Sequence, residues 1–266
     1  MRTALGIMMA LALSKVGYGA EYTFSNPAPV DKKRELSTDR PDKTESPITV
    51  DAGYFQMESD FISTTFDSGD RQSSSYLATN LKLGLTHTMD VQIVINPWTE
   101  ERVGEDSSFE TGFGDTTLRL KWNLLGNDGG PFAIGLMPFV KVPTAKDKFG
   151  NKKYEGGLIL PVSLTLTEEW DLGLMLEINY EKNEEDGGFH NVFISSITTS
   201  HSLLGELSGY TEFYSETSKD SDWEAYFDVG LTYGLSPDHQ LDAGVNWGIT
   251  KDADDYNYFA GFSIRT

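Results

Sequence analysis

Apolar and polar side chains alternate with a period of two along most of the chain after residue 53. Residues 158–166 carry Leu or Val at every even position, and residues 172–180 carry Leu, Ile or Tyr at every even position. Residues 223–235 repeat the pattern with apolar side chains at the odd positions. A period of two places successive side chains on opposite faces of a β-strand, whereas an amphipathic helix has a period of about 3.6. The pattern predicts an all-β protein whose strands have one apolar face and one polar face.

The alternating segments are long and number about twelve. Most run for about ten residues, which suits a tilted strand that crosses a bilayer. Strands of soluble proteins are usually shorter, at about five or six residues. The segments begin near Tyr54, Tyr76, Met89, Thr116, Phe132, Gly157, Trp170, Asn191, Gly205, Trp223, Leu241 and Tyr256.

The connections between these segments alternate between long polar stretches and tight turns. The long stretches are 67–74, 100–115, 144–154 and 181–190, and the tight turns are 86–90, 125–130 and 167–169. Outer-membrane barrels have long loops outside the cell and short turns in the periplasm. Aromatic side chains also gather near the segment ends, as they do at membrane interfaces. The sequence therefore predicts a transmembrane, antiparallel, up-and-down β-barrel of about 12 strands, with both chain ends in the periplasm.

The N-terminal part of the chain divides into two stretches before the barrel. An early arginine, an apolar run over residues 4–13 and then small residues are typical of a secretory signal peptide, so we expect residues 1–20 to be removed on export. Residues 21–52 are polar and contain four prolines, which favours an extended periplasmic lead-in or plug segment over a packed element. The outer-membrane barrel is then expected over residues 53–266.

The composition narrows the classes of function. The chain carries 21 Lys and Arg against 41 Asp and Glu, so its surface would repel nucleic acid. It has no cysteine, which excludes disulfides, thiolate metal sites and a cysteine nucleophile. Its mean hydropathy of −0.36 fits a barrel, because only every second strand residue faces lipid.

In such a barrel the polar face of each strand lines the lumen. Charged residues of that parity include Asp60, Lys82, Lys141, Glu206, Asp228 and Asp242. The acidic and basic residues of the lead-in are expected to pair with lumenal charges and so to plug or gate the lumen. The lumen and plug candidates are Asp39, Arg40, Asp42, Glu58, Arg119, Lys121, Glu177 and Glu212. About twelve strands lie between filled barrels of about eight and open porins of about sixteen, so the strand number leaves open whether the lumen conducts.

No residue pattern points to catalysis, a cofactor or a bound metal. The four histidines do not pair at a metal-ligand spacing. The rival enzyme is an outer-membrane barrel esterase, which would need a serine activated by a histidine. His201 and Ser202 are adjacent and would point to opposite faces of a strand, and the chain has no G-x-S-x-G motif. The acidic runs at 184–188 and 252–255 lack the calcium-loop pattern and are expected to be solvated loops.

Three sequence motifs carry a resemblance to a known family. They are TDRPDKTESP at 38–47 with QME at 56–58, GFGDT at 112–116 with RLKWNL at 119–124, and PFVKVPT at 138–144. Together they resemble the outer-membrane transporter family that is also labelled as the MetA-pathway of phenol degradation, over residues 36–266. The resemblance implies an outer-membrane β-barrel that moves small, aromatic or hydrophobic compounds. The chain departs from other outer-membrane barrels by ending in Thr266 rather than in an aromatic residue, which bears on its insertion.

We expect the chain to pass or transport small solutes, with aromatic or hydrophobic compounds among the candidates. A non-conducting structural or surface-interaction barrel, a secreted β-sandwich binding module and the barrel esterase are the alternatives. The expected partners are outer-membrane lipids and lipopolysaccharide, the barrel-assembly machinery and a small-molecule solute. No cofactor and no nucleic acid are expected, and the sequence leaves the oligomeric state open.

Overall fold

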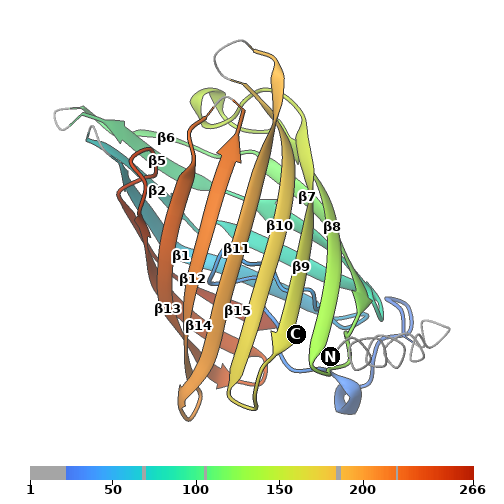
Figure 1. Cartoon of the computed structure of the whole chain (residues 1–266). Coiled ribbons are helices and arrows are strands. Elements are labelled where there is room, and N and C mark those ends of the chain that lie inside the picture. Colours follow the sequence, from blue (N-terminus) through green and yellow to red (C-terminus); the bar gives the residue numbers. More distant parts are fainter. Residues whose placement is uncertain (1–21, 68–69, 105–106, 184–186, 220) are drawn as a thin grey trace.

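The computed structural model describes residues 22–67, 70–104, 107–183, 187–219 and 221–266. The expected signal peptide lies outside these residues, as does the start of the acidic run at Glu184. Fifteen strand segments and two short 3₁₀ helices, η1 (Val30–Lys32) and η2 (Asp147–Phe149), make up the regular structure of the described chain (Figure 1). No helix in the described ranges is long and apolar enough to cross a membrane.

The strands form one antiparallel sheet, and β1 pairs with β15, so that the sheet closes into a barrel (Figure 1). The strands are β1 (Phe55–Asp67), β2 (Arg71–Tyr76), β3 (Thr79–Thr86), β4 (Met89–Ile95), β5 (Trp98–Val103), β6 (Glu110–Gly112), β7 (Thr116–Leu125), β8 (Phe132–Val142), β9 (Glu155–Thr165), β10 (Trp170–Lys182), β11 (Phe189–Leu204), β12 (Leu207–Ser218), β13 (Glu224–Ser236), β14 (His239–Gly248) and β15 (Tyr256–Arg265). β3 and β2 form one wall strand, because β3 pairs with the first half of β1 and β2 pairs with its second half. In the same way β5 continues β4, and β6 continues β7. The segments therefore form twelve wall strands. The predicted barrel class and strand number are confirmed, and the closed sheet excludes the β-sandwich.

Two predicted connections are shorter than expected. β2 occupies part of the predicted stretch 67–74, and β5 and β6 occupy parts of the predicted stretch 100–115. These segments are rich in serine and glutamate and extend the wall beyond its apolar band. The hydrophobic alternation that marks the other strands is missing from these segments, so the sequence pattern did not identify them as strands.

The tight turns and the long connections lie at opposite ends of the barrel (Figure 1). Turns 87–88, 205–206 and 237–238 lie at the end where β15 finishes, and connection 143–154 lies at the other end. In outer-membrane barrels the tight turns are periplasmic. The mouth with the tight turns is therefore the periplasmic mouth.

Large apolar side chains cover the outer face of the barrel. Leu176, in the middle of β10, is 62% exposed. Others on this face are Leu118, Trp122, Val140, Leu158, Phe193, Ile197, Phe227, Leu231 and Leu241. Aromatic pairs stack near the strand ends, Trp170 with His201 at the periplasmic end and Tyr180 with Phe189 at the outer end. An apolar band between aromatic girdles is the surface of an outer-membrane barrel in lipid.

The chain before β1 runs inside the barrel (blue in Figure 1). We call residues 34–52 the inner segment. It contacts walls that are far apart in the sequence: the Asn123 side chain donates to the Pro47 carbonyl at 2.8 Å, and the hydroxyls of Thr44 and Ser196 are 2.6 Å apart. The inner segment therefore crosses the lumen rather than lying along one wall.

An apolar cluster also faces the lumen. Met137, Ile159, Met175, Val192 and Ile194 pack together on β8 to β11, each at most 5% exposed, with Phe139 against them. They have the same parity as the lumenal polar residues of these strands. The interior is therefore mixed, whereas the sequence pattern predicted a polar lumen.

Candidate functional site

Asp39 is the centre of a buried ionic cluster on the wall formed by β1, β3 and β7. Its carboxylate accepts hydrogen bonds from the ammonium groups of Lys82 and Lys121 at 2.5 Å each, and from the Ser46 backbone N–H at 3.0 Å. Glu58 completes the cluster, because it pairs with Lys82 and accepts the Asp39 backbone N–H at 2.9 Å. Burial acts to raise the pKa of Asp39, but the two ammonium groups outweigh it and hold the pKa below its usual range. The cluster is thus a set of mutually compensating charges with little access to water.

Arg40 points to the seam where β1 closes on β15. Its Nη1 donates to Asp60 at 2.6 Å, and its Nη2 and Nε donate to Asp242 at 2.6 and 3.2 Å. Both carboxylates belong to the lumenal parity predicted from the sequence. The guanidinium therefore ties the inner segment to β1 and β14 at once.

The next residues of the inner segment face an acidic wall formed by β12 and β13. Glu212 accepts the backbone N–H groups of Lys43 and Thr44 at 2.7 and 2.8 Å, and the Thr44 hydroxyl at 2.5 Å. Asp42 lies near the carboxylates of Glu212 and Asp228, and burial together with the charge of Glu212 raises the pKa of Asp42 well above its usual range. Asp42 makes no ion pair with any base that the structure describes. The expected pairing of Asp42 with a lumenal cation is wrong, because backbone N–H groups rather than basic side chains satisfy this wall.

Glu45 makes a third contact, with Arg119 on β7. The Arg119 Nη1 donates to Glu45 at 2.6 Å, and Glu177 acts on the same guanidinium at longer range. The second oxygen of Glu45 and the Nε of Arg119 have no hydrogen-bond partner among the described residues. Burial raises the pKa of Glu45 to about 7, against the attraction of Arg119. The carboxyl group of Glu45 in this contact therefore changes its protonation near neutral pH.

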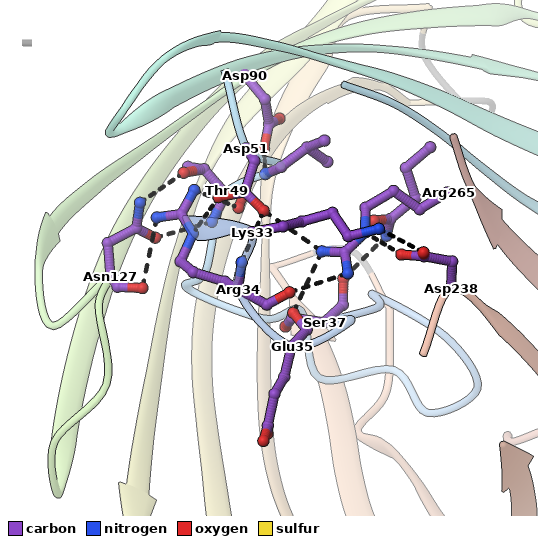
Figure 2. A network of polar contacts seen from close by, with 12 residues as sticks. Lys33, Arg34, Glu35, Ser37, Thr49, Asp51, Asp90, Asn127, Asp238 and Arg265 are labelled. Atoms are coloured by element: carbon purple, nitrogen blue, oxygen red, sulfur yellow. Dashed lines mark hydrogen bonds and ion pairs between the residues drawn. The ribbon is translucent and has the colours of Figure 1, made fainter. Parts of the chain in front are cut away.

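A polar network holds both ends of the inner segment at the periplasmic mouth (Figure 2). Arg34 donates to Asp51 at 2.8 Å, which ties the start of the inner segment to its end. Arg265, the last residue of β15, donates to the Arg34 carbonyl and to Asp238, both at 2.9 Å. Lys33 pairs with the same Asp238. The base of the inner segment is thus joined to β15 and to the turn before β14.

Two further lumenal predictions have different outcomes. Lys141 pairs with Glu155 towards the outer end of β8 and β9. Glu206 lies exposed in the periplasmic turn between β11 and β12, so its prediction as a lumenal residue is wrong. The alternation that assigns a face to a strand residue carries no such meaning in a turn.

The candidates chosen from the sequence omitted Glu45, Arg34, Asp51 and Arg265. A period of two along the extended inner segment could have identified Glu45. Asp39 and Glu45 are both odd-numbered and face the basic wall, whereas Arg40 and Thr44 are even-numbered and face acidic residues. Nothing in the pattern of Arg34 and Asp51 indicates that they meet.

A cavity of about 340 Å³ lies on the outer side of the inner segment. Its lining residues come from the inner segment, from β1 and β12 to β15, and from the connection between β14 and β15: Lys43, Thr65, Tyr214, Glu216, Tyr226, Asn246, Asp254, Tyr256 and Asn257. Lys43 of the inner segment is one of these lining residues. Across the described chain, no group of three or more His, Asp or Glu side chains is placed to hold a metal ion.

Comparison with protein families identifies one match. A family model described as "Putative MetA-pathway of phenol degradation" matches residues 38–266. No curated protein sequence matches the chain.

Solved structures share the fold at low sequence identity. An outer membrane channel from Pseudomonas putida F1 aligns over 86% of this chain and 100% of its own, with a TM-score of 0.62 and 13% identity. The NanC porin aligns over 79% of this chain and 98% of its own, with a TM-score of 0.53 and 9% identity. The KdgM porin covers the same shares with a TM-score of 0.50 and 9% identity. At these identities the likeness establishes the barrel fold.

Proposed function

The chain belongs to the family described as "Putative MetA-pathway of phenol degradation", and from this premise we propose that it is an outer-membrane channel for small solutes, closed by its own inner segment. The observation that carries the proposal is the course of the inner segment across the lumen. It bonds to Lys82 and Lys121 on one side and to Glu212 and Asp242 on the other. A segment held on both sides of a twelve-stranded lumen leaves little room for a hydrated solute.

We propose that the solutes are small molecules with an aromatic or otherwise apolar part. Support for this class comes from the family description, which names a pathway of phenol degradation. The lumenal cluster around Met137, Ile159 and Met175 is packed and buried in the closed barrel, so a solute would reach it only after the interior opens. The printed names of the structural relatives, an outer membrane channel and two porins, fit passage of solutes through such a barrel.

No catalytic activity forms part of the proposal. Ser236 Oγ and His239 Nδ1 are 2.8 Å apart, but the pair lies exposed in a periplasmic turn. A serine nucleophile needs a substrate pocket and a group that orients the histidine, and neither accompanies this pair in the part of the chain that the structure describes.

The remaining partners follow from the location. We propose that residues 1–20 direct export, that the barrel-assembly machinery inserts the chain, and that lipopolysaccharide surrounds the outer girdle. Thr266 donates its backbone N–H to the Phe55 carbonyl at 2.9 Å, so it takes part in the pairing of the chain after β15 with β1.

Single-channel recording of purified protein in planar bilayers tests the proposal. The wild type is compared with a variant that lacks residues 21–50 and with Asp31→Asn, which changes an exposed residue outside the inner segment. We expect a low conductance for the wild type and for Asp31→Asn, and a several-fold higher conductance after the deletion. The rate at which proteoliposomes swell in a neutral aromatic solute should likewise be low for the wild type and for Asp31→Asn and higher after the deletion.

Two outcomes contradict the proposal in different ways. An unchanged conductance in the deletion variant would show that the inner segment does not close the lumen. A folded deletion variant, verified by heat-modifiable gel mobility, that conducts nothing would favour the non-conducting structural barrel.

A further inference from the structure

Three residues form a row across the seam of the barrel. In the sheet register, Asp60 of β1 and Asp242 of β14 both pair with Gly261 of β15. The two carboxylates therefore flank a glycine on the strand between them, and all three positions face the lumen. The Arg40 guanidinium lies over this row.

The row fits the shape of a guanidinium group. One edge of the Arg40 guanidinium donates through Nη2 and Nε to the two oxygens of Asp242, and its Nη1 donates to Asp60. Such a forked arrangement uses the planar donor geometry that distinguishes arginine from lysine. A Cβ at Gly261 would lie 2.2 Å from Nη2, so the glycine provides the space in which the cation sits.

The electrostatics of the row also require a cation. The Asp242 side chain is 0% exposed and that of Asp60 is 15% exposed. Among the described residues, Arg40 is the basic side chain that pairs with either of them. Two carboxylates in one row, on the strands either side of β15 and with so little water, repel each other when no cation is bound.

We propose that the row Asp60–Gly261–Asp242 is a binding site for guanidinium groups, which Arg40 occupies while the channel is closed. Solutes that carry a guanidinium or amidinium head group take the same place when the inner segment withdraws, and they compete with Arg40 for it. The inference rests on the proposed function, because in the wild type the row is free for a solute only when the inner segment carries Arg40 out of it. It adds a class of ligand, a planar nitrogen cation, that the apolar cluster does not indicate.

Calorimetric titration of Arg40→Ala with guanidinium chloride tests the site directly. This change removes the internal ligand and leaves the row intact. We expect saturable binding of guanidinium at millimolar concentration, and no saturable binding of sodium or tetramethylammonium at the same ionic strength. Neither of these ions can form the forked set of hydrogen bonds.

Three double variants in the Arg40→Ala background test and control this site. Asp242→Asn removes the carboxylate that receives two of the three hydrogen bonds, and its affinity for guanidinium should fall at least about tenfold, as expected for charge-assisted hydrogen bonds. Gly261→Ala fills the space with a methyl group and should abolish binding. Asp31→Asn, which removes a carboxylate from an exposed position outside the inner segment, should leave the affinity unchanged.

Binding of guanidinium that is equal in all these variants, or matched by tetramethylammonium, would overturn the proposal. If Arg40→Ala does not fold, the variant that lacks residues 21–50 replaces it, because it also lacks Arg40. Guanidinium binding and conductance are also measured together on the variant that lacks residues 21–50. In that variant, guanidinium binding with the wild-type conductance would refute the channel closure and leave the site, whereas raised conductance without guanidinium binding would refute the site alone.

Discussion

Neutralising Asp39 should release the inner segment from the basic wall. In Asp39→Asn the shape of the side chain is kept, but Lys121 loses its acidic partner, while Lys82 keeps Glu58. The Lys121 side chain is 1% exposed, so it loses its paired carboxylate in a place with little water and keeps only the longer-range attraction of Asp90 and Glu45. Removing one partner of a buried ion pair costs about 3 to 5 kcal/mol.

The smaller figure is the better guide here, because only one of the two lysines loses its partner. A cost of about 3 kcal/mol shifts an equilibrium by roughly two orders of magnitude. The shift applies to the equilibrium between the docked and the released inner segment, since the barrel strands themselves keep their pairing. We therefore expect openings about a hundred times more frequent than in the wild type.

Single-channel recording measures the opening frequency, and limited proteolysis of folded barrels reports how often the inner segment is released. Asp31→Asn is the control, because it removes the same charge from an exposed position. The double variant Asp39→Asn, Lys121→Gln removes this ammonium group and should recover much of the closure. The reasoning is refuted if Asp39→Asn opens no more often than Asp31→Asn, or if the double variant is as open as the single one.

Three other expectations concern pH, close packing and lipid contact. Burial raises the pKa of Glu45 from 4.5 to about 7 in the docked state. Docking of the inner segment is therefore strongest below pH 4.5 and weakens as the pH rises through 7. The opening frequency should increase from pH 5 to pH 8, and Glu45→Gln should flatten that increase. A Cβ at Gly84 would lie 1.9 Å from the Asp51 carbonyl oxygen, so Gly84→Ala should displace the end of the inner segment and raise its cleavage by protease, while an unchanged cleavage rate would contradict this packing. Leu176→Arg places a charge on the lipid face at mid-strand and should destabilise the barrel by about 2 to 4 kcal/mol in urea unfolding from vesicles. Leu204→Arg, at the periplasmic end of β11, should cost no more than about 1 kcal/mol, and equal losses for the two would argue against the assigned lipid band.

The wall of the barrel could be predicted from the sequence because lipid imposes a strict rule on every second residue. Strand starts such as Met89, Phe132 and Trp170 agree with the structure, since each begins an alternating run. The upper strands β2, β5 and β6 escaped prediction because they lie above the lipid, where their polar side chains need not alternate.

The interior was less predictable, because it depends on which side chains meet across the lumen. Parity placed Lys121 and Glu212 in the interior, but it gave no information on their partners. The pairing of Asp39 with two lysines and the position of Asp42 beside other acids depend on the path of a segment with no regular structure. The apolar cluster around Met175 was missed for a related reason, since its residues share a face with charged ones.

The path of the inner segment also determines how force acts on it. The segment enters and leaves through the periplasmic mouth: the Phe24 backbone N–H bonds to Leu85 before the segment, and the Gly84 N–H bonds to Tyr54 after it. It is therefore a loop that reaches into the barrel and returns, not a thread passed through it. A pull on residues 22–33 from the periplasm would withdraw the loop one contact at a time, without parting the seam between β1 and β15. A push from outside would instead load the contacts on both walls together, so we expect the inner segment to be withdrawn towards the periplasm at a lower force than the force that displaces it from outside.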